Sequence, residues 1–162
     1  MRRKGFTIIE LVIYMSILSV LLLFFTELFA TLVNKQLETE SVSSVQQDAN
    51  YLLSRLSYDF GRASHISLPT TPGAPVSSMQ LMIGPKYYNF SSNSGNMIIE
   101  QGGIQSILNS SETTISNLTF QRLGVGNAAD VVQVKFDITS RIKQQAGYDV
   151  THFSTTLGIR EK

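Results

Sequence analysis

The chain has 162 residues, 43% of them hydrophobic and 15% charged, which is enough apolar material for one compact domain with a packed core. It contains no cysteine, so disulfide frameworks, thiolate metal sites and cysteine nucleophiles are excluded. Arg2, Arg3 and Lys4 supply three of the 13 basic residues, and the remaining 10 are outnumbered by 12 acidic residues. A nucleic-acid-binding domain normally shows a basic excess, so this balance argues against that class.

A long apolar segment follows the basic residues. Phe6–Val33 reads FTIIELVIYMSILSVLLLFFTELFATLV and has 16 consecutive uncharged residues between Glu10 and Glu27. A helix needs about 20 mostly apolar residues to cross a bilayer, so this segment predicts a single transmembrane helix. Because basic flanks stay in the cytoplasm, we expect the N-terminus inside and the chain after about residue 34 outside the membrane.

Two alternatives compete for this segment. A secretory signal peptide fits the basic start, but the apolar stretch is longer than a typical signal and no A-x-A cleavage site follows it. A plain uncleaved anchor explains the length and the basic flank. Neither explains Glu10, since a carboxylate in a membrane segment is costly and usually functional.

The stretch Lys4–Leu11, KGFTIIEL, resembles the processing site of type IV pilins and pseudopilins. In that family a prepilin peptidase removes a short basic leader after a glycine, on the cytoplasmic face of the membrane. The new N-terminal residue is then N-methylated, and a glutamate at the fifth mature position serves filament assembly. The resemblance implies cleavage after Gly5, a methylated N-terminus at Phe6 and an assembly role for Glu10.

Charge explains why such a site needs Glu10. Cleavage after Gly5 would leave an α-amino group on Phe6, at the head of a helix that packs among other helices in a filament. An unpaired buried cation is strongly unfavourable, and a carboxylate from a neighbouring subunit would neutralise it. Glu10 lies just over one helical turn from Phe6, near the positive end of the helix dipole. Gly5, without a side chain, would let a protease hold the backbone closely.

The resemblance also implies partners and a location. The partners would be the prepilin peptidase, other pilin or pseudopilin subunits, an inner-membrane assembly platform, and membrane lipid before assembly. The chain would be a single-pass protein of the bacterial cytoplasmic membrane that later enters an envelope or cell-surface filament. Whether that filament serves secretion, adhesion, motility or DNA uptake is left open.

The helical pattern continues beyond the apolar segment. No glycine or proline interrupts Phe6–Phe60, and from Leu37 onward one face is apolar, which predicts an amphipathic helix docked on a core. The apolar positions are Leu37, Val42, Val45, Ala49, Leu52, Leu53, Leu56, Phe60 and Ala63. The residues assigned to the opposite, polar face are Gln46, Gln47, Asp48, Asn50, Ser54 and Asp59.

Glu27 has two interpretations: it reaches the lipid headgroups at the outer end of the span, or it makes a second polar contact in a filament. Many major pilins carry a helix-breaking proline in this segment, whereas this chain has none between Phe6 and Pro69. A straighter helix of this kind favours a minor subunit.

After Gly61 and a proline-rich stretch, Leu68–Pro75, the apolar period changes to two. The strands we predict are Ser78–Ile83, Lys86–Phe90, Asn96–Gln101, Gly103–Leu108, Ile115–Gln121, Asp130–Thr139 and Asp149–Leu157. The expected fold is α+β and pilin-like, with one antiparallel sheet packed on the second half of the helix. The expected division is a leader over 1–5, a transmembrane or filament-core helix over 6–33, its amphipathic continuation over 34–63 and a β head over 64–162.

The head shows no catalytic pattern. His65 and His152, expected in a loop and a strand, have no nucleophile motif or HExxH helix near them, and the acidic residues lack calcium-loop spacing. We therefore expect no catalytic, cofactor-binding or metal-binding residues and no enzyme activity. Tyr87, Tyr88 and Phe90 form an aromatic cluster, interpreted either as alternate burial on a strand or as a contact patch for a neighbouring subunit or a secreted cargo.

Three short tracts, Leu56–Ala63, Ile115–Phe120 and Ser154–Arg160, resemble the minor pseudopilin of the J type and related minor pilins. Three hypotheses follow for the whole chain. It is a minor pilin or pseudopilin, a simple membrane-anchored binding domain outside any filament, or an envelope enzyme with a hidden site. The first is favoured because it alone accounts for Gly5, Phe6 and Glu10 together.

Overall fold

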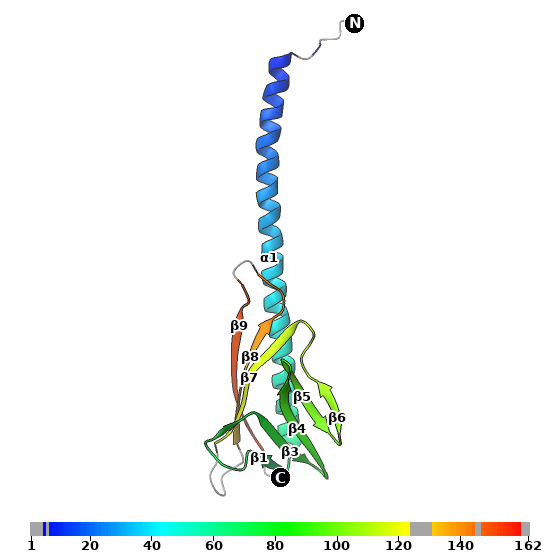
Figure 1. Ribbon diagram of the computed structural model, residues 1–162, viewed down its shortest axis with the longest axis vertical. Helices are drawn as coiled ribbons and strands as arrows, with labels where there is room; N and C mark the ends of the chain where they lie inside the picture. Colours follow the sequence, from blue (N-terminus) through cyan, green and yellow to red (C-terminus); the bar gives the residue numbers. More distant parts are fainter. Residues whose placement is uncertain (1–4, 6, 124–130, 145–146, 160–162) are drawn as a thin grey trace. The chain divides into compact units, whose positions relative to one another are not determined.

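The computed structural model describes residue 5 and residues 7–123, 131–144 and 147–159. The chain divides into two compact units, one up to Thr39 and one from Glu40 onward. A single helix, α1 (Ile8–Arg62), runs through both, and all the strands belong to the second unit (Figure 1). The uninterrupted helix predicted from the absence of glycine and proline is confirmed.

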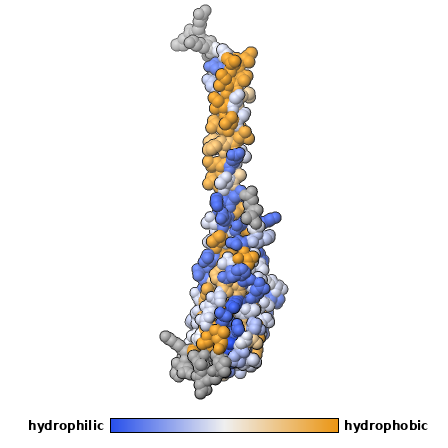
Figure 2. Space-filling model, turned by 90° about the vertical axis from the view of Figure 1, so that its left-hand side faces the viewer, coloured by the Kyte–Doolittle hydropathy of each residue, from blue (hydrophilic) through white to orange (hydrophobic). Residues whose placement is uncertain are grey.

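The first part of α1 exposes its apolar side chains. Large hydrophobic residues from Ile8 to Val33 are 39–86% exposed, and Figure 2 shows the hydrophobic surface that they form. By length and composition this part of the helix is able to cross a membrane. Polar side chains inside it are satisfied locally, because Ser16, Ser19, Thr26 and Thr31 each donate a hydrogen bond to the carbonyl four residues earlier.

The strands form two antiparallel sheets where one was predicted. The first sheet has the order β1-β3-β4-β5-β6 and the second the order β2-β7-β8-β9 (Figure 1). The strands are β1 (His65–Leu68), β2 (Pro75–Val76), β3 (Ser78–Ile83), β4 (Lys86–Asn93), β5 (Asn96–Gln101), β6 (Ile104–Ile107), β7 (Thr113–Arg122), β8 (Val131–Ser140) and β9 (Val150–Gly158). β1 and β2 were not predicted, and His65 lies in β1 rather than in a loop.

Both missed strands are short and lie at sheet edges. Each has only one hydrogen-bonded neighbour, and β2 begins with Pro75, a residue that edge strands tolerate. β2 has two residues, too few to show alternation, and β1 alternates over only four residues directly after the helix, so pairing with β3 and β7 is what defines these strands. Asp130, the predicted first residue of the strand that became β8, lies outside the described residues.

Tight turns set the register of the first sheet. Ser94 and Gly95 both have positive φ between β4 and β5, as do Gly102 and Gly103 between β5 and β6, which is the geometry of type I′ hairpins. A Cβ at Gly95 would lie 2.7 Å from a methyl group of Thr114 on β7. Gly95 therefore serves both the turn and the close approach of the two sheets.

The core lies between the second half of α1 and the two sheets. Its largest fully buried side chains include Phe60 of α1, Phe90 of β4, Phe120 of β7 and Phe136 of β8. The inward face predicted for β8 is confirmed, since Val132, Val134, Phe136 and Ile138 are at most 1% exposed. On the helix, Val45, Ala49, Leu52, Leu56 and Phe60 are buried, whereas Val42 is 46% exposed.

Two residues predicted for the polar face of the helix are buried. Asp48 is 7% exposed, and its Oδ2 accepts hydrogen bonds from the amide and hydroxyl of Ser110, at 2.9 and 2.8 Å, and from the hydroxyl of Thr113. Asp59 is fully buried, and its Oδ2 accepts a 2.8 Å hydrogen bond from Nε of Arg55. The two sheets cover a wider arc of the helix than its apolar stripe, so carboxylates at the border become buried and partnered.

Candidate functional site

The start of α1 carries a capping box made by Thr7 and Glu10. The amide of Glu10 donates to Oγ1 of Thr7 at 3.4 Å, and the amide of Thr7 donates to Oε2 of Glu10 at 3.3 Å. The Thr7 hydroxyl also donates to Oε2 at 3.3 Å. These reciprocal bonds satisfy two of the amides that a helix leaves unpaired at its N-terminus. Glu10 thus has a structural role in its own helix, which the T-x-x-E spacing signals and our sequence interpretation missed.

Of the three residues predicted for processing and assembly, the structure describes two. Gly5 is exposed and non-helical, and no atom would lie within 4 Å of a Cβ placed on it. Phe6 lies outside the described residues. Glu10 is half-buried in the first turn of α1, surrounded by the exposed apolar residues Ile8, Ile9 and Leu11. A carboxylate therefore lies five positions after an accessible glycine, at the head of an apolar helix.

Glu27 lies on the exposed surface of α1. The hydroxyl of Thr31 donates to its backbone carbonyl at 2.9 Å, which is part of the local satisfaction of polar groups along this helix. Neither interpretation of the Glu27 carboxylate is tested by this geometry.

His152 belongs to a polar cluster on the outer face of the second sheet. Its Nδ1 lies 2.5 Å from Oδ1 of Asp137, and Nδ2 of Asn117 donates to Oδ2 of Asp137 at 2.7 Å. Asn117 has φ of 51° at the bulge in β7, where two residues oppose one on β8. Among the described residues no group of three His, Cys, Asp or Glu side chains could hold a metal ion.

The pKa of Asp137 is held below its ordinary value. Burial alone would raise this pKa, but the hydrogen bonds from Asn117 and His152, together with the charge of protonated His152, outweigh burial. The ionised carboxylate is therefore favoured in the folded chain.

A pH-dependent contribution to stability follows. A lowered pKa in the folded state means that Asp137 stabilises the fold above its unfolded pKa of about 4, and that this stabilisation is lost as the pH falls through the folded pKa. We expect the difference in free energy of unfolding between the wild type and Asp137→Asn to shrink below about pH 4. Urea unfolding of the full chain in detergent at several pH values measures it. A difference that grows as the pH falls below about 4 would contradict the assignment.

The three aromatic residues of the β4 cluster differ in burial, because neighbouring residues of a strand point to opposite faces of the sheet. Phe90 is fully buried in the core, Tyr88 is half-buried and Tyr87 is 53% exposed. Alternate burial therefore explains Phe90, while the two tyrosines contribute to a groove beside α1.

Comparison with known proteins gives one match. Residues 1–26 match the model of the prokaryotic N-terminal methylation motif, and these residues include Gly5, Phe6, Thr7 and Glu10. No curated protein and no solved structure matches the chain. The match supports a type IV pilin-like chain, and proteins with this motif are structural proteins rather than enzymes. The model covers only the start of the chain.

Proposed function

We propose that the chain is a minor structural subunit of a type IV pilus or a related secretion pseudopilus, processed after Gly5 and assembled through α1. The observation that carries this proposal is the match of residues 1–26 to the methylation motif, on a helix whose apolar side chains are exposed from Ile8 to Val33. An apolar surface of this extent is unfavourable in water. Lipid would bury it before assembly, and neighbouring helices would bury it in the filament.

The proposed topology places the N-terminus in the cytoplasm and the β head outside. Arg2, Arg3 and Lys4 precede the apolar part of α1, while beyond it Lys35 is already paired with Glu38 at 2.7 Å. Three basic residues therefore lie directly before the apolar part of α1 against Lys35 directly after it, which favours retention of the N-terminal side in the cytoplasm.

Assembly in this proposal depends on an exchange of partners by Glu10. In the single chain its carboxylate accepts hydrogen bonds from Thr7. In a filament the cationic amine of a neighbour's Phe6 would compete for the same carboxylate, and a charge-assisted bond is about twice as strong as a neutral one. The capping interaction would keep the carboxylate accessible at the helix end until then.

A minor rather than major role rests on the absence of a proline within α1 and on the resemblance to J-type and other minor pilin heads. The proposed partners remain a prepilin peptidase, other filament subunits and an inner-membrane assembly platform. The alternative is a single-pass anchored binding domain that keeps residues 1–5 and never enters a filament.

Substitution of Gly5 separates the two functions. Gly5→Leu is expected to block cleavage by a coexpressed prepilin peptidase, because a branched side chain would obstruct the close backbone approach that glycine allows. Intact mass of the membrane-extracted chain measures cleavage, with and without the peptidase.

Thr7→Ser, which keeps the capping hydroxyl and leaves Gly5 unchanged, is the matched control and should be cleaved normally. An anchored domain would show the full-length mass in every case, and cleavage of Gly5→Leu at the wild-type rate would contradict the assigned cleavage position.

A further inference from the structure

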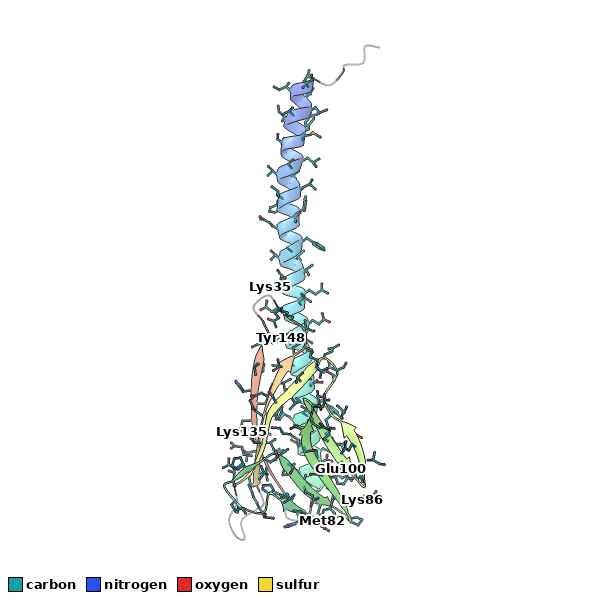
Figure 3. The ribbon with its side chains drawn as sticks, viewed as in Figure 1. Lys35, Met82, Lys86, Glu100, Lys135 and Tyr148 are labelled. Carbon is teal, nitrogen blue, oxygen red and sulfur yellow. The ribbon has the colours of Figure 1, made fainter. Side chains whose placement is uncertain are left out.

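A groove of about 740 Å³ lies between the second half of α1 and the edge of the first sheet. Tyr51 and Arg55 line it from the helix, Lys86 and Tyr88 from β4, and Ile104 and Ile107 from β6. All these residues belong to the second compact unit. Figure 1 shows β6 as the outermost strand on this side, and Figure 3 shows Lys86 near the end of the sheet formed by the turn between β3 and β4.

The core-facing side of β6 is uncovered. Ile104 pairs with Gln101 and Ser106 pairs with Ile99, so Ile104 shares a face of the sheet with Ile99. Ile99 is 7% exposed under the helix, yet Ile104 is 73% exposed. The sheet therefore extends one strand beyond the cover that α1 provides, and the groove is the space left there.

The outer edge of β6 offers hydrogen bonds to a further strand. Leu108 donates its amide to the carbonyl of Met97 at 2.9 Å, which places Leu108 among the residues bonded to β5. Alternation in an antiparallel ladder then directs the amide and carbonyl groups of Gln105 and Ile107 away from β5. Among the described strands β6 has a neighbour on one side only, and all four of its residues are exposed.

The described lining of the groove contains two cations, Arg55 and Lys86, and no acid, and Arg55 is already ion-paired with Asp59, which does not line the groove. Arg55 uses Nε to bond Asp59, and its two terminal amino groups have no hydrogen-bond partner in the described structure. Asp59 is fully buried, and its Oδ1 also lacks a partner among the described residues. Lys86 is exposed at the groove, and none of the described lining residues is acidic. A carboxylate would match the planar donors of Arg55 in two-point geometry.

We propose that this groove binds an extended segment of a partner protein, which adds to β6 as an antiparallel or parallel strand and places one carboxylate against Arg55. Backbone bonds to Gln105 and Ile107 would supply affinity, and the inward side chains of the segment would fill the groove beside Ile104, Tyr51 and Tyr88. An exposed edge strand with apolar side chains promotes aggregation unless something covers it. A bound partner segment would cover β6 and so explains why the chain can keep such an edge. The proposal is independent of processing at Gly5 and of filament assembly.

The test uses the full chain in detergent and a fluorescein-labelled peptide of alternating valine and threonine with one central glutamate. Binding is followed by fluorescence anisotropy. Gln105→Pro removes the outward amide without touching the ladder to β5, and we expect at least about a tenfold loss of affinity from the lost bond and the clash. Gln105→Ala keeps that amide and is the matched control, with binding near that of the wild type. Melting curves of both variants confirm that they fold.

The carboxylate is tested in the peptide, because removal of Arg55 would leave Asp59 buried without a counter-charge. Changing the peptide's glutamate to glutamine is expected to weaken binding about fivefold to tenfold, and changing it to lysine further. Three results would overturn the proposal. These are equal binding by Gln105→Pro, full competition by free acetate, which indicates an anion site only, or self-association of the chain through β6 that the peptide does not displace.

Discussion

Replacement of Glu10 by glutamine is expected to abolish incorporation into a filament while leaving the chain processed, folded and in the membrane. Glutamine keeps the capping geometry with Thr7, since the capping box accepts either residue at this position. It removes the charge that the proposal requires opposite the amine of a neighbouring Phe6. Breaking a buried ion pair costs about 3–5 kcal/mol, which corresponds to a loss in subunit affinity of about 100- to 4000-fold.

The matched control is Thr7→Ala. It breaks the capping box but leaves the Glu10 carboxylate in place, so it is expected to lower helix stability by about 1 kcal/mol and to assemble. The measurement is the amount of each variant in the sheared filament fraction relative to the membrane fraction. If Glu10→Gln assembles and Thr7→Ala does not, the role of Glu10 is local capping and the intersubunit contact is wrong.

Replacement of Asp48 by alanine is expected to destabilise the β head strongly. Asp48 joins α1 to the start of β7 and the segment before it, because the Ser110 amide and the hydroxyls of Ser110 and Thr113 all donate to its Oδ2. Alanine would remove three charge-assisted hydrogen bonds and leave the buried hydroxyl of Thr113 without this acceptor, while the exposed Ser110 could bond to water, at a total cost of about 3 kcal/mol. For a head of this size that lowers the melting temperature by about 10 °C.

Asp48→Asn is the matched control for this loss. It retains an oxygen acceptor of the same shape and removes only the charge, so it should lose about half as much stability as alanine. Thermal unfolding of the full chain in detergent, followed by circular dichroism in the β-sheet region, measures both. Equal melting temperatures for the wild type and Asp48→Ala would show that the contact between Asp48 and Ser110 does not stabilise the fold.

The sequence predicts the regular parts of this fold well. The strands Ser78–Ile83 and Asn96–Gln101 have the predicted bounds, because alternating apolar residues and glycine turns both mark them. The helix is confirmed because no residue in its interior breaks the backbone hydrogen-bond pattern. The division into two sheets was missed, since it depends on β6 not pairing with the next strand, β7, and on β2 pairing with β7 across the whole first sheet, and no local pattern shows either.

The polar features were harder to predict than the apolar ones. Asp48 and Asp59 were assigned to a solvated face because charged residues usually are exposed. Asp48 is buried next to Ser110 and Thr113, and Asp59 next to Arg55. Only the folded structure shows that Ser110 and Thr113 lie beside Asp48. The groove beside β6 likewise combines Tyr51 of α1 with Ile104 about 50 residues later, a juxtaposition that no local pattern contains.

The proposed processing and assembly site is the opposite case. Gly5, Phe6 and Glu10 form a local motif that the sequence displays in full, and the family comparison matches the same residues. The structure adds the capping role of Glu10 with Thr7 and the exposure of Gly5. Tertiary structure contributes little else here, because the proposed function of these residues depends on a peptidase and on neighbouring subunits.

The most direct test of the account is the intact mass of the chain isolated from native filaments and, separately, from the cytoplasmic membrane before assembly. We predict that every filament-bound molecule lacks Met1–Gly5 and carries a methyl group on the amine of Phe6. A chain that is recovered from filaments with its first five residues still attached would show that no new amine exists for Glu10 to neutralise, and would contradict the account.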